Sequence, residues 1–133
     1  MKRIINSSKS PSPVGPYNQA IMAGNTLYIS GQIGIDRKTG NLVMDDIESE
    51  THQVMKNIGY ILEAAGMDFG DIVKCTVFVK DIGMYSRINA VYARYFEGAT
   101  APARELVEVA NLPNYMNVEI SCIAVLYPNI ESP

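Results

Sequence analysis

The most informative segment of the chain is IVKCTVFV, at residues 72–79. Its β-branched and aromatic residues favour a strand. Successive side chains of a strand point to opposite faces, and here both alternating sets are mostly apolar. We therefore expect a strand in the interior of a sheet, with both of its faces covered.

Amphipathic helices are predicted on either side of this strand. Apolar residues recur at helical spacing over Ile47–Ala65, and Asp45 or Asp46 is available as the N-cap. A second set of apolar residues at helical spacing covers Met84–Phe96, and this helix is expected to end near Gly98. The two helices and the strand between them outline a mixed α and β domain.

Further strands are expected at residues 19–23, 26–30, 106–109 and 118–126. Gly24 and Asn25 suit a two-residue hairpin turn between the first two of these strands. The predicted fold is a single α+β domain over residues 1–133, with a six-stranded mixed sheet and two helices packed on one face. The other face would expose Ile123 and Val125, so self-association is expected to cover it.

Composition narrows the range of partners. The chain has 133 residues, of which 47% are hydrophobic and 19% charged, as is usual for a globular domain. A net charge of -3 gives no general attraction to phosphate backbones, so a nucleic-acid partner is not expected. Residues 1–10 lack a hydrophobic signal region and no apolar stretch of about 20 residues occurs, so we expect a cytoplasmic protein without a membrane partner.

Metal and nucleophile chemistry find little support in the sequence. His52 is the only histidine and is expected to be a solvated residue of the first helix. Cys75 and Cys122 lie in apolar runs without ligand-like spacing, so we expect two buried thiols and no disulfide framework. Glycine loops with the spacing of nucleotide-binding motifs are absent from the sequence. We therefore predict neither a metal nor a cofactor.

Arginine and carboxylate chemistry remains. Arg104 follows Pro102 and Ala103 at the start of a predicted strand, so its guanidinium can be aimed at a carboxylate, although an ordinary surface arginine is the alternative. Glu119 lies within an apolar strand, where an unpaired charge is costly. That position indicates either a buried ion pair or a catalytic task.

Two further segments are candidates for a ligand site. Residues 30–34, SGQIG, contain two glycines, which permit close approach of a ligand to the backbone, although a plain tight turn explains them equally well. Tyr17 lies in a loop rich in Ser and Pro, where its ring can close a pocket or pack on the core.

Five short motifs follow one another over nearly the whole chain. They are Gly15-Pro16-Tyr17-Asn18-Gln19-Ala20, Ser30-Gly31-Gln32, Asn89 with Tyr92 and Phe96, Pro102-Ala103-Arg104, and Val118-Glu119-Ile120. Each motif alone is weakly specific, but their ordered series resembles the signature of the RidA (YjgF-like) reactive intermediate deaminase family.

This resemblance implies a chorismate-mutase-like fold that assembles as a homotrimer, with the sheets forming a central barrel and the ligand clefts lying between subunits. It also implies an enzyme, a 2-iminobutanoate/2-iminopropanoate deaminase. Such an enzyme hydrolyses reactive 2-imino and enamine acids to 2-oxo acids and ammonia without a cofactor.

The resemblance also implies roles for individual residues. Arg104 would clamp the substrate carboxylate with help from the Gly31 backbone, and Glu119 would hold and activate the attacking water. The other residues at the substrate would be Tyr17, Ser30, Asn89 and Leu106.

The chain departs from the family pattern directly after Arg104. Glu105 and Leu106 stand where the family commonly has Ser or Thr and then Cys. The backbone carbonyl of Leu106 would still face the substrate nitrogen. The Glu105 carboxylate could compete for the Arg104 guanidinium or repel an anionic substrate, unless strand alternation turns it away.

Two other functions stay open. A regulatory module could bind small carboxylates in the same cleft without turnover. An endoribonuclease or translation inhibitor, an activity also attributed to some members of the family, would need a basic groove, which the acidic balance of the chain disfavours.

Overall fold

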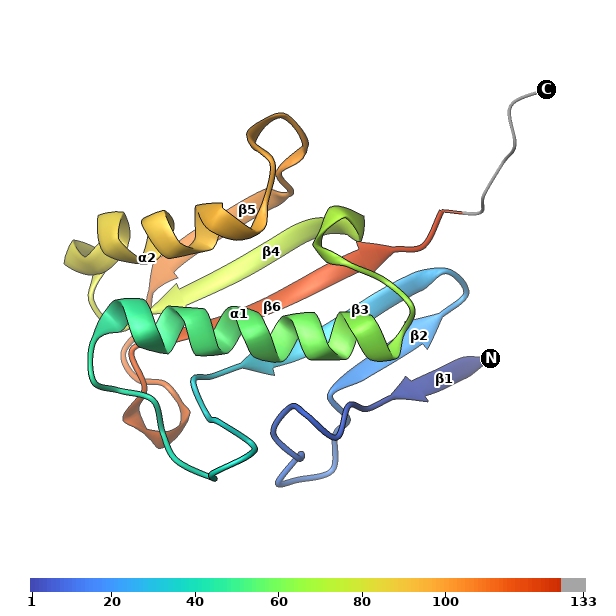
Figure 1. Ribbon diagram of the computed structural model, residues 1–133, viewed down its shortest axis with the longest axis horizontal. Helices are drawn as coiled ribbons and strands as arrows, with labels where there is room; N and C mark the ends of the chain where they lie inside the picture. The colour runs from blue at the N-terminus through green and yellow to red at the C-terminus, as the bar shows by residue number, and fades with distance from the viewer. Residues whose placement is uncertain (128–133) are drawn as a thin grey trace.

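The computed structural model describes residues 1–127 and contains a mixed sheet of six strands in the order β1-β2-β3-β6-β4-β5 (Figure 1). The strands are β1 (Lys2–Ile5), β2 (Ala20–Ala23), β3 (Thr26–Gln32), β4 (Ile72–Val79), β5 (Ala103–Glu108) and β6 (Val118–Val125). Strands β4 and β5 are parallel, and the other neighbouring pairs are antiparallel. The predicted α+β class is confirmed.

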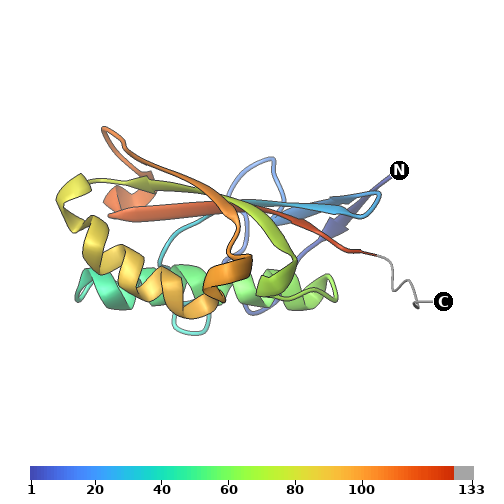
Figure 2. The ribbon, with the colours of Figure 1, turned by 90° about the horizontal axis from the view of Figure 1, so that it is seen from above.

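Helices α1 (Ile47–Ala64) and α2 (Tyr85–Tyr92) cover the same face of the sheet (Figure 2). Their apolar sides meet the side chains of β3, β4 and β6 that point toward them, which form the core. Cys75 of β4 and Cys122 of β6 are buried there as free thiols, with their Sγ atoms 3.3 Å apart. Among residues 1–127, no helix is long and apolar enough to cross a membrane.

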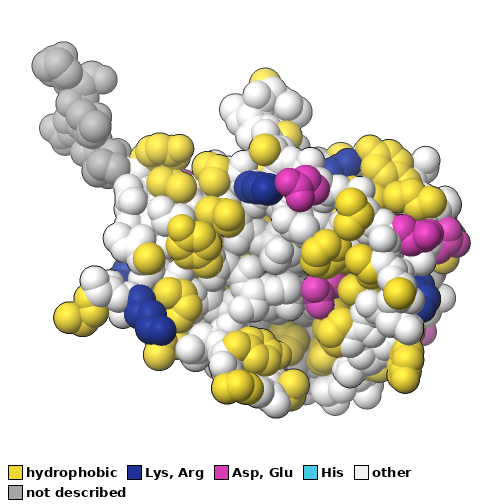
Figure 3. All heavy atoms as spheres, turned by 180° about the vertical axis from the view of Figure 1, so that it is seen from behind, with side chains coloured by type: hydrophobic (Ala, Val, Ile, Leu, Met, Phe, Trp, Pro, Cys, Tyr) yellow, Lys and Arg dark blue, Asp and Glu magenta, His cyan; other side chains and the backbone are white. Residues whose placement is uncertain are grey.

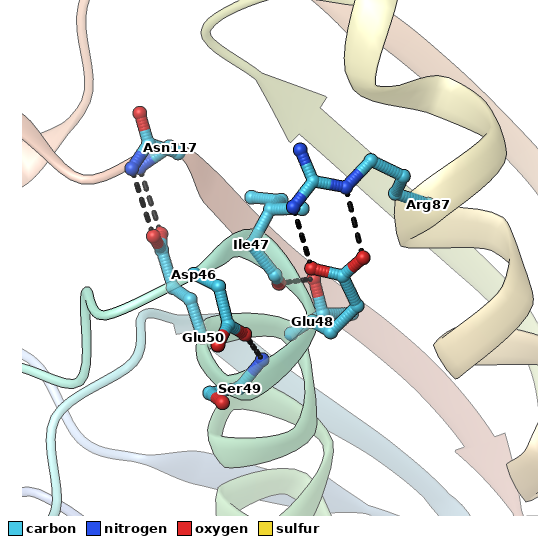
Figure 4. A network of polar contacts seen from close by, with 8 residues as sticks. Asp46, Ile47, Glu48, Ser49, Glu50, Arg87 and Asn117 are labelled. Atoms are coloured by element: carbon cyan, nitrogen blue, oxygen red, sulfur yellow. Dashed lines mark hydrogen bonds and ion pairs between the residues drawn. The ribbon is translucent and has the colours of Figure 1, made fainter.

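The two helices are fixed at the N-terminal end of α1 (Figure 4). Asp46 is the N-cap, and its carboxylate accepts a hydrogen bond from the Ser49 backbone N–H at 2.7 Å. The Arg87 guanidinium of α2 donates two hydrogen bonds to Glu48, at 2.8 and 2.7 Å. This pairing lowers the pKa of Glu48 to about 2. The contact holds the two helices together on the covered face of the sheet.

The opposite face of the sheet carries no helix, and hydrophobic side chains are spread over it (Figure 3). Tyr28 of β3 is 50% exposed and Val107 of β5 is 46% exposed, while Ile123 and Val125 of β6 are half-buried. In a single chain, then, the interior strand β4 is covered on one side only. The apolar groups of the bare face need a second protein surface to leave water.

The largest differences from the sequence prediction concern β1, β5 and α2. Strand β1 was not expected, because Lys2 and Arg3 give it no apolar pattern, and it is defined by its pairing with β2 at the sheet edge. Strand β5 begins at Ala103 and not at Leu106, since its parallel pairing with β4 extends past the apolar part. Helix α2 ends at Tyr92 and continues as a 3-10 turn over Ala93–Tyr95, which keeps the apolar spacing.

His52 lies on α1 as expected, but it is only partly solvated. Its Nδ1 lies 3.0 Å from the Tyr95 hydroxyl, its Nε2 lies 3.2 Å from the Arg94 guanidinium, and the ring is half-buried. Burial, followed by the positive charges of Arg94 and Lys56, lowers the pKa of His52. The histidine therefore links α1 to the turn after α2 and belongs to neither candidate cavity described below.

Candidate functional site

Four of the predicted site residues line one cavity of about 530 Å³. They are Tyr17, Ser30, Gly31 and Glu119. The cavity lies between the loop at residues 11–17, the end of β3 and the turn before β6. Residues far apart in the sequence meet here because β3 and β6 are neighbours in the sheet.

Glu119 lies directly against Gly31. A Cβ atom at position 31 would be 2.7 Å from both Cδ and Oε2 of Glu119, closer than side-chain contacts allow. The register between β3 and β6 shifts between Ile29 and Gln32, and this irregularity brings the Gly31 backbone under the carboxylate. A side chain at position 31 would therefore displace the Glu119 carboxylate from its present position.

The Glu119 carboxylate has no hydrogen-bond or ion-pair partner within residues 1–127. It is half-buried, and this burial raises its pKa. The buried ion pair that the sequence left open is not present in a single chain. A carboxylate with a raised pKa at the wall of a cavity is suited to accept a proton near neutral pH.

A buried amide fixes the loop that forms the outer wall. Gln19 is 2% exposed, and its side chain accepts a hydrogen bond from the Ser7 backbone N–H at 2.6 Å. Its amide nitrogen donates to the carbonyl oxygens of Ser7, Ser10 and Pro11, at 3.0, 3.2 and 2.9 Å. The loop is thereby ordered before Tyr17, whose side chain is 50% exposed at the rim.

A second buried carboxylate, Glu50, was not predicted. It is fully buried on α1 and accepts hydrogen bonds from the Asn117 backbone and side chain, at 2.7 and 2.9 Å, and from the Val118 backbone at 3.0 Å (Figure 4). It holds the chain directly before Glu119. No sequence pattern indicates this role, because an acidic residue in the first turn of a helix is ordinarily a solvated one.

The turn before β6 also contributes wall residues that the sequence analysis missed. Pro113 and Asn114 line the cavity, and the backbone of Asn114 has a left-handed φ of 57°. Asn tolerates this region better than most residues, and such conformations cluster at functional sites. The sequence signal for this turn is an Asn that directly follows a Pro.

Arg104 lines a different cavity, of about 250 Å³, together with Asn89, Tyr92 and Phe96. Its guanidinium donates hydrogen bonds to Asn89 Oδ1 at 2.8 Å and to the Tyr85 hydroxyl at 3.0 Å. The guanidinium carbon also lies 4.8 Å from the centre of the Tyr92 ring. The arginine is thus held in one orientation by α2, with some of its N–H groups left free.

Within one chain, Arg104 and Glu119 lie on opposite faces of the sheet. Arg104 pairs with Cys75 of β4, whose side chain is buried under the helices. Glu119 pairs with Phe78, three residues further along β4, where side chains point to the bare face. The structure therefore brings Tyr17, Ser30, Gly31 and Glu119 together, and Asn89 with Arg104, but it does not join the two sets within one chain.

The two residues after Arg104 follow the alternation of the strand. Glu105 points to the bare face, where its carboxylate lies 3.0 Å from the Lys74 ammonium. It does not compete for the Arg104 guanidinium in the single chain. Leu106 points back to the helices, packs against the core and lines neither cavity with its side chain. Within the described part of the chain, no three His, Cys, Asp or Glu side chains are grouped so that they could hold a metal ion.

Comparisons with known proteins agree with this architecture. The family model described as Endoribonuclease L-PSP matches residues 7–126. A RutC family protein of Pyrococcus horikoshii is 51% identical over 124 residues, which cover 93% of this chain and 98% of the relative. The 2-iminobutanoate/2-iminopropanoate deaminase of Mus musculus is 42% identical over 132 residues, which cover 99% and 97% of the two chains. The crystal structure of the YjgF gene product of E. coli superposes with a TM-score of 0.87 at 42% identity and covers 92% of this chain and 98% of its own.

The chain therefore belongs to the RidA (YjgF-like) family, whose members the Endoribonuclease L-PSP model describes. Relatives that carry the deaminase name are 42–46% identical to it. This similarity supports the activity of the family for this chain, and the resemblance seen in the five sequence motifs is confirmed.

Proposed function

We propose that this protein hydrolyses 2-imino and enamine acids, such as 2-iminobutanoate and 2-iminopropanoate, to 2-oxo acids and ammonia. The observation that carries the proposal is a carboxylate without a partner, Glu119, in the wall of a cavity, together with an arginine whose guanidinium is already oriented. The deaminase name of several close relatives supports the same reaction.

The two sets of residues would form one site between neighbouring copies of the chain. In this arrangement, Arg104 and Asn89 of one copy face Tyr17, Ser30, Gly31 and Glu119 of the next. A trimer of chorismate-mutase-like form, with the bare faces of the sheets turned inward, would also remove Tyr28 and Val107 from water. The opposite placement of the two sets supports a composite cleft, because a single chain cannot complete one.

The chemistry needs one anchor and one base. The guanidinium of Arg104 would bind the substrate carboxylate, with the Gly31 backbone beside it, and the Leu106 carbonyl would accept from the substrate nitrogen. Tyr17, Ser30 and Asn89 would shape the cleft. An imine carbon is already electrophilic, so orientation against a held water supplies much of the rate.

The proton steps balance without a cofactor. As the oxygen of the attacking water bonds to the imine carbon, Glu119 takes a proton from that water. Glu119 then passes the proton to the imine nitrogen. Transfer of the remaining hydroxyl proton to nitrogen then breaks the C–N bond. Ammonia leaves, and the 2-oxo acid forms.

The test is a coupled assay in which an amino-acid oxidase generates 2-iminobutanoate and ammonia release is followed. The protein should accelerate release over buffer, and Arg104→Ala should lower kcat/KM on the order of 100-fold, since a charged anchor is lost. Arg3→Ala, an exposed arginine on β1, is the matched control and should have no effect. If the wild-type protein does not accelerate ammonia release over buffer, the proposal is refuted.

If turnover is absent but 2-oxobutanoate binds saturably in a calorimeter, a regulatory module that binds carboxylates is the better assignment. The name of the matching family model also makes RNA cleavage a second candidate. It would be favoured if repurified protein cleaved RNA and Glu119→Gln removed the cleavage.

A further inference from the structure

A second large cavity lies away from both candidate half-sites. Its volume is about 570 Å³, and its wall comes from three segments that are distant in sequence: the start of the Ser- and Pro-rich loop, the turn after β3 and the outer side of α1. The lining residues are Ser8, Lys9, Asp36, Arg37, Lys38, Gln53, Lys56 and Tyr60. None of them lines the cavities of Glu119 or Arg104.

The charge of this cavity is opposite to that of the chain. Four of the 11 Lys and Arg residues line it, although the whole chain carries a net charge of -3. Asp36 is the one carboxylate in the wall of the cavity. Glu63 lies outside the wall and forms an ion pair with Lys9, with 3.2 Å between Oε1 and Nζ. Positive charge therefore remains in excess, and like charges that face the same space repel one another unless an anion lies between them.

Several of these groups are held in place. Arg37 is exposed, but its Nη1 donates a hydrogen bond of 2.7 Å to the Ser10 carbonyl, which directs the guanidinium. The Lys38 backbone is fixed by its N–H bond of 3.0 Å to Asp36 Oδ1. Lys9 lies 5.7 Å from the centre of the Tyr60 ring on α1. The cations are thus presented from an ordered turn, an ordered loop and a helix.

We propose that this cavity binds the di- or triphosphate group of a small organic ligand. Its volume falls in the range of about 300–1,000 Å³ usual for small-molecule sites, and exceeds what a single phosphate would fill. Several cations on different segments match a chain of phosphates better than an isolated monoanion. Gln53, Ser8 and the face of Tyr60 are neutral groups that the rest of the ligand would contact.

The proposal does not rest on the deaminase activity. The cavity opens on the helix-bearing side, and its cations are not used by Arg104, Glu119 or their neighbours. The two sites share two segments. The loop that begins at Ser7 contributes Lys9 to this cavity and Pro11 to the other, and the segment after β3 contributes Asp36 to this cavity and Ile35 to the other.

The test is calorimetric titration of the full-length protein with inorganic tripolyphosphate and with ATP, at low salt. Lys38→Gln/Lys56→Gln should weaken tripolyphosphate binding on the order of tenfold, because two exposed charge contacts are lost. Arg37 is left intact, since it also holds the loop at Ser10. Lys2→Gln/Arg3→Gln is the matched control, with the same loss of charge on exposed positions of β1, and should change the affinity less than about twofold.

Tighter binding of ATP than of tripolyphosphate would support the site and assign a nucleoside to it, whereas equal affinities would support recognition of the phosphate chain alone. The proposal would be overturned by the absence of saturable binding of both probes, by equal affinity for orthophosphate and tripolyphosphate, or by equal losses in the two double variants. A circular dichroism spectrum and melting curve for each variant verify that the fold is intact.

Discussion

A mixture of two inactive variants should regain activity. Arg104→Ala removes the anchor from the helix-bearing face of the sheet, and Glu119→Gln removes the base from the bare face. Each variant alone should retain less than about 1% of the wild-type kcat/KM, since loss of a charged anchor or a general base costs on the order of 100-fold or more. One chain keeps the two groups on opposite faces, so in the proposed composite cleft they would come from different chains.

The expected recovery follows from that geometry. In a closed ring of chains, every cleft takes its arginine from one copy and its glutamate from the next. In an equal random mixture, half of the copies offer an intact Arg104 and half offer an intact Glu119. About one quarter of the clefts then contain both, so about one quarter of the wild-type activity should return, whatever the number of copies in the ring.

The assay requires co-expression of the two variants with different affinity tags, purification of the total pool and measurement of ammonia release from 2-iminobutanoate. Mass spectrometry of the intact assemblies verifies that mixing is random. If mixed assemblies were present and activity remained at the level of the separate variants, clefts shared between chains would be excluded. If activity returns in the mixture, an active site built from a single chain is refuted.

Four further outcomes follow from individual contacts. Gly31→Ala should lower kcat/KM on the order of 100-fold, because its Cβ displaces the Glu119 carboxylate; an unfolding curve close to that of the wild type identifies the loss as local. Glu119→Gln should raise the melting temperature at pH 7 while it removes activity. Because burial raises the pKa of Glu119, the folded chain holds the proton of this carboxyl more tightly than the unfolded chain does. The stability of the wild-type protein therefore falls as pH rises from about 4.5 through the folded pKa, and the gain in melting temperature of the variant should shrink at pH 4. A gain independent of pH would show that the buried charge of Glu119 is not its cause. Glu50→Ala should cost about 3 kcal/mol or more in urea unfolding, since three donors lose their acceptor, and a loss below about 1 kcal/mol would show that water replaces it. Glu105→Gln should leave kcat/KM within about twofold, since its carboxylate is turned toward Lys74 and a surface ion pair contributes little; a large gain in activity would show that Glu105 acts on Arg104 after all.

The sequence was sufficient for most of the fold because its strongest patterns are those of buried elements. The run at residues 72–79 and the helix from Ile47 both bury apolar side chains at fixed spacing, and both are present. Strand β1 was missed because its residues are exposed and its existence depends on β2, a partner that local pattern does not reveal. The partners of His52 were not predicted for a related reason, since Tyr95 and Arg94 reach it from 42 or more residues away.

The candidate site was predictable as a set of residues but not as a geometry. The sequence motifs identified Gly31 and Glu119 separately. Only the register of β3 against β6 shows that the Glu119 carboxylate occupies the space of a side chain at position 31. Glu50 escaped notice because its three hydrogen bonds go to residues 67 or 68 positions away. That Arg104 and Glu119 fall on different faces depends on the strand order, which periodicity does not determine.

The contact between position 31 and the carboxylate of Glu119 also limits the order in which this chain can change. A lineage that acquires any side chain at 31 while the acid is present must move that acid, so the step is selected against as long as the acid is needed. Once the acid is replaced by a small residue, position 31 becomes free to vary. Descendants with a larger residue at position 31 should therefore be found only among those that have already lost the glutamate. The residues at these two positions then indicate whether a descendant has kept the acid-dependent chemistry.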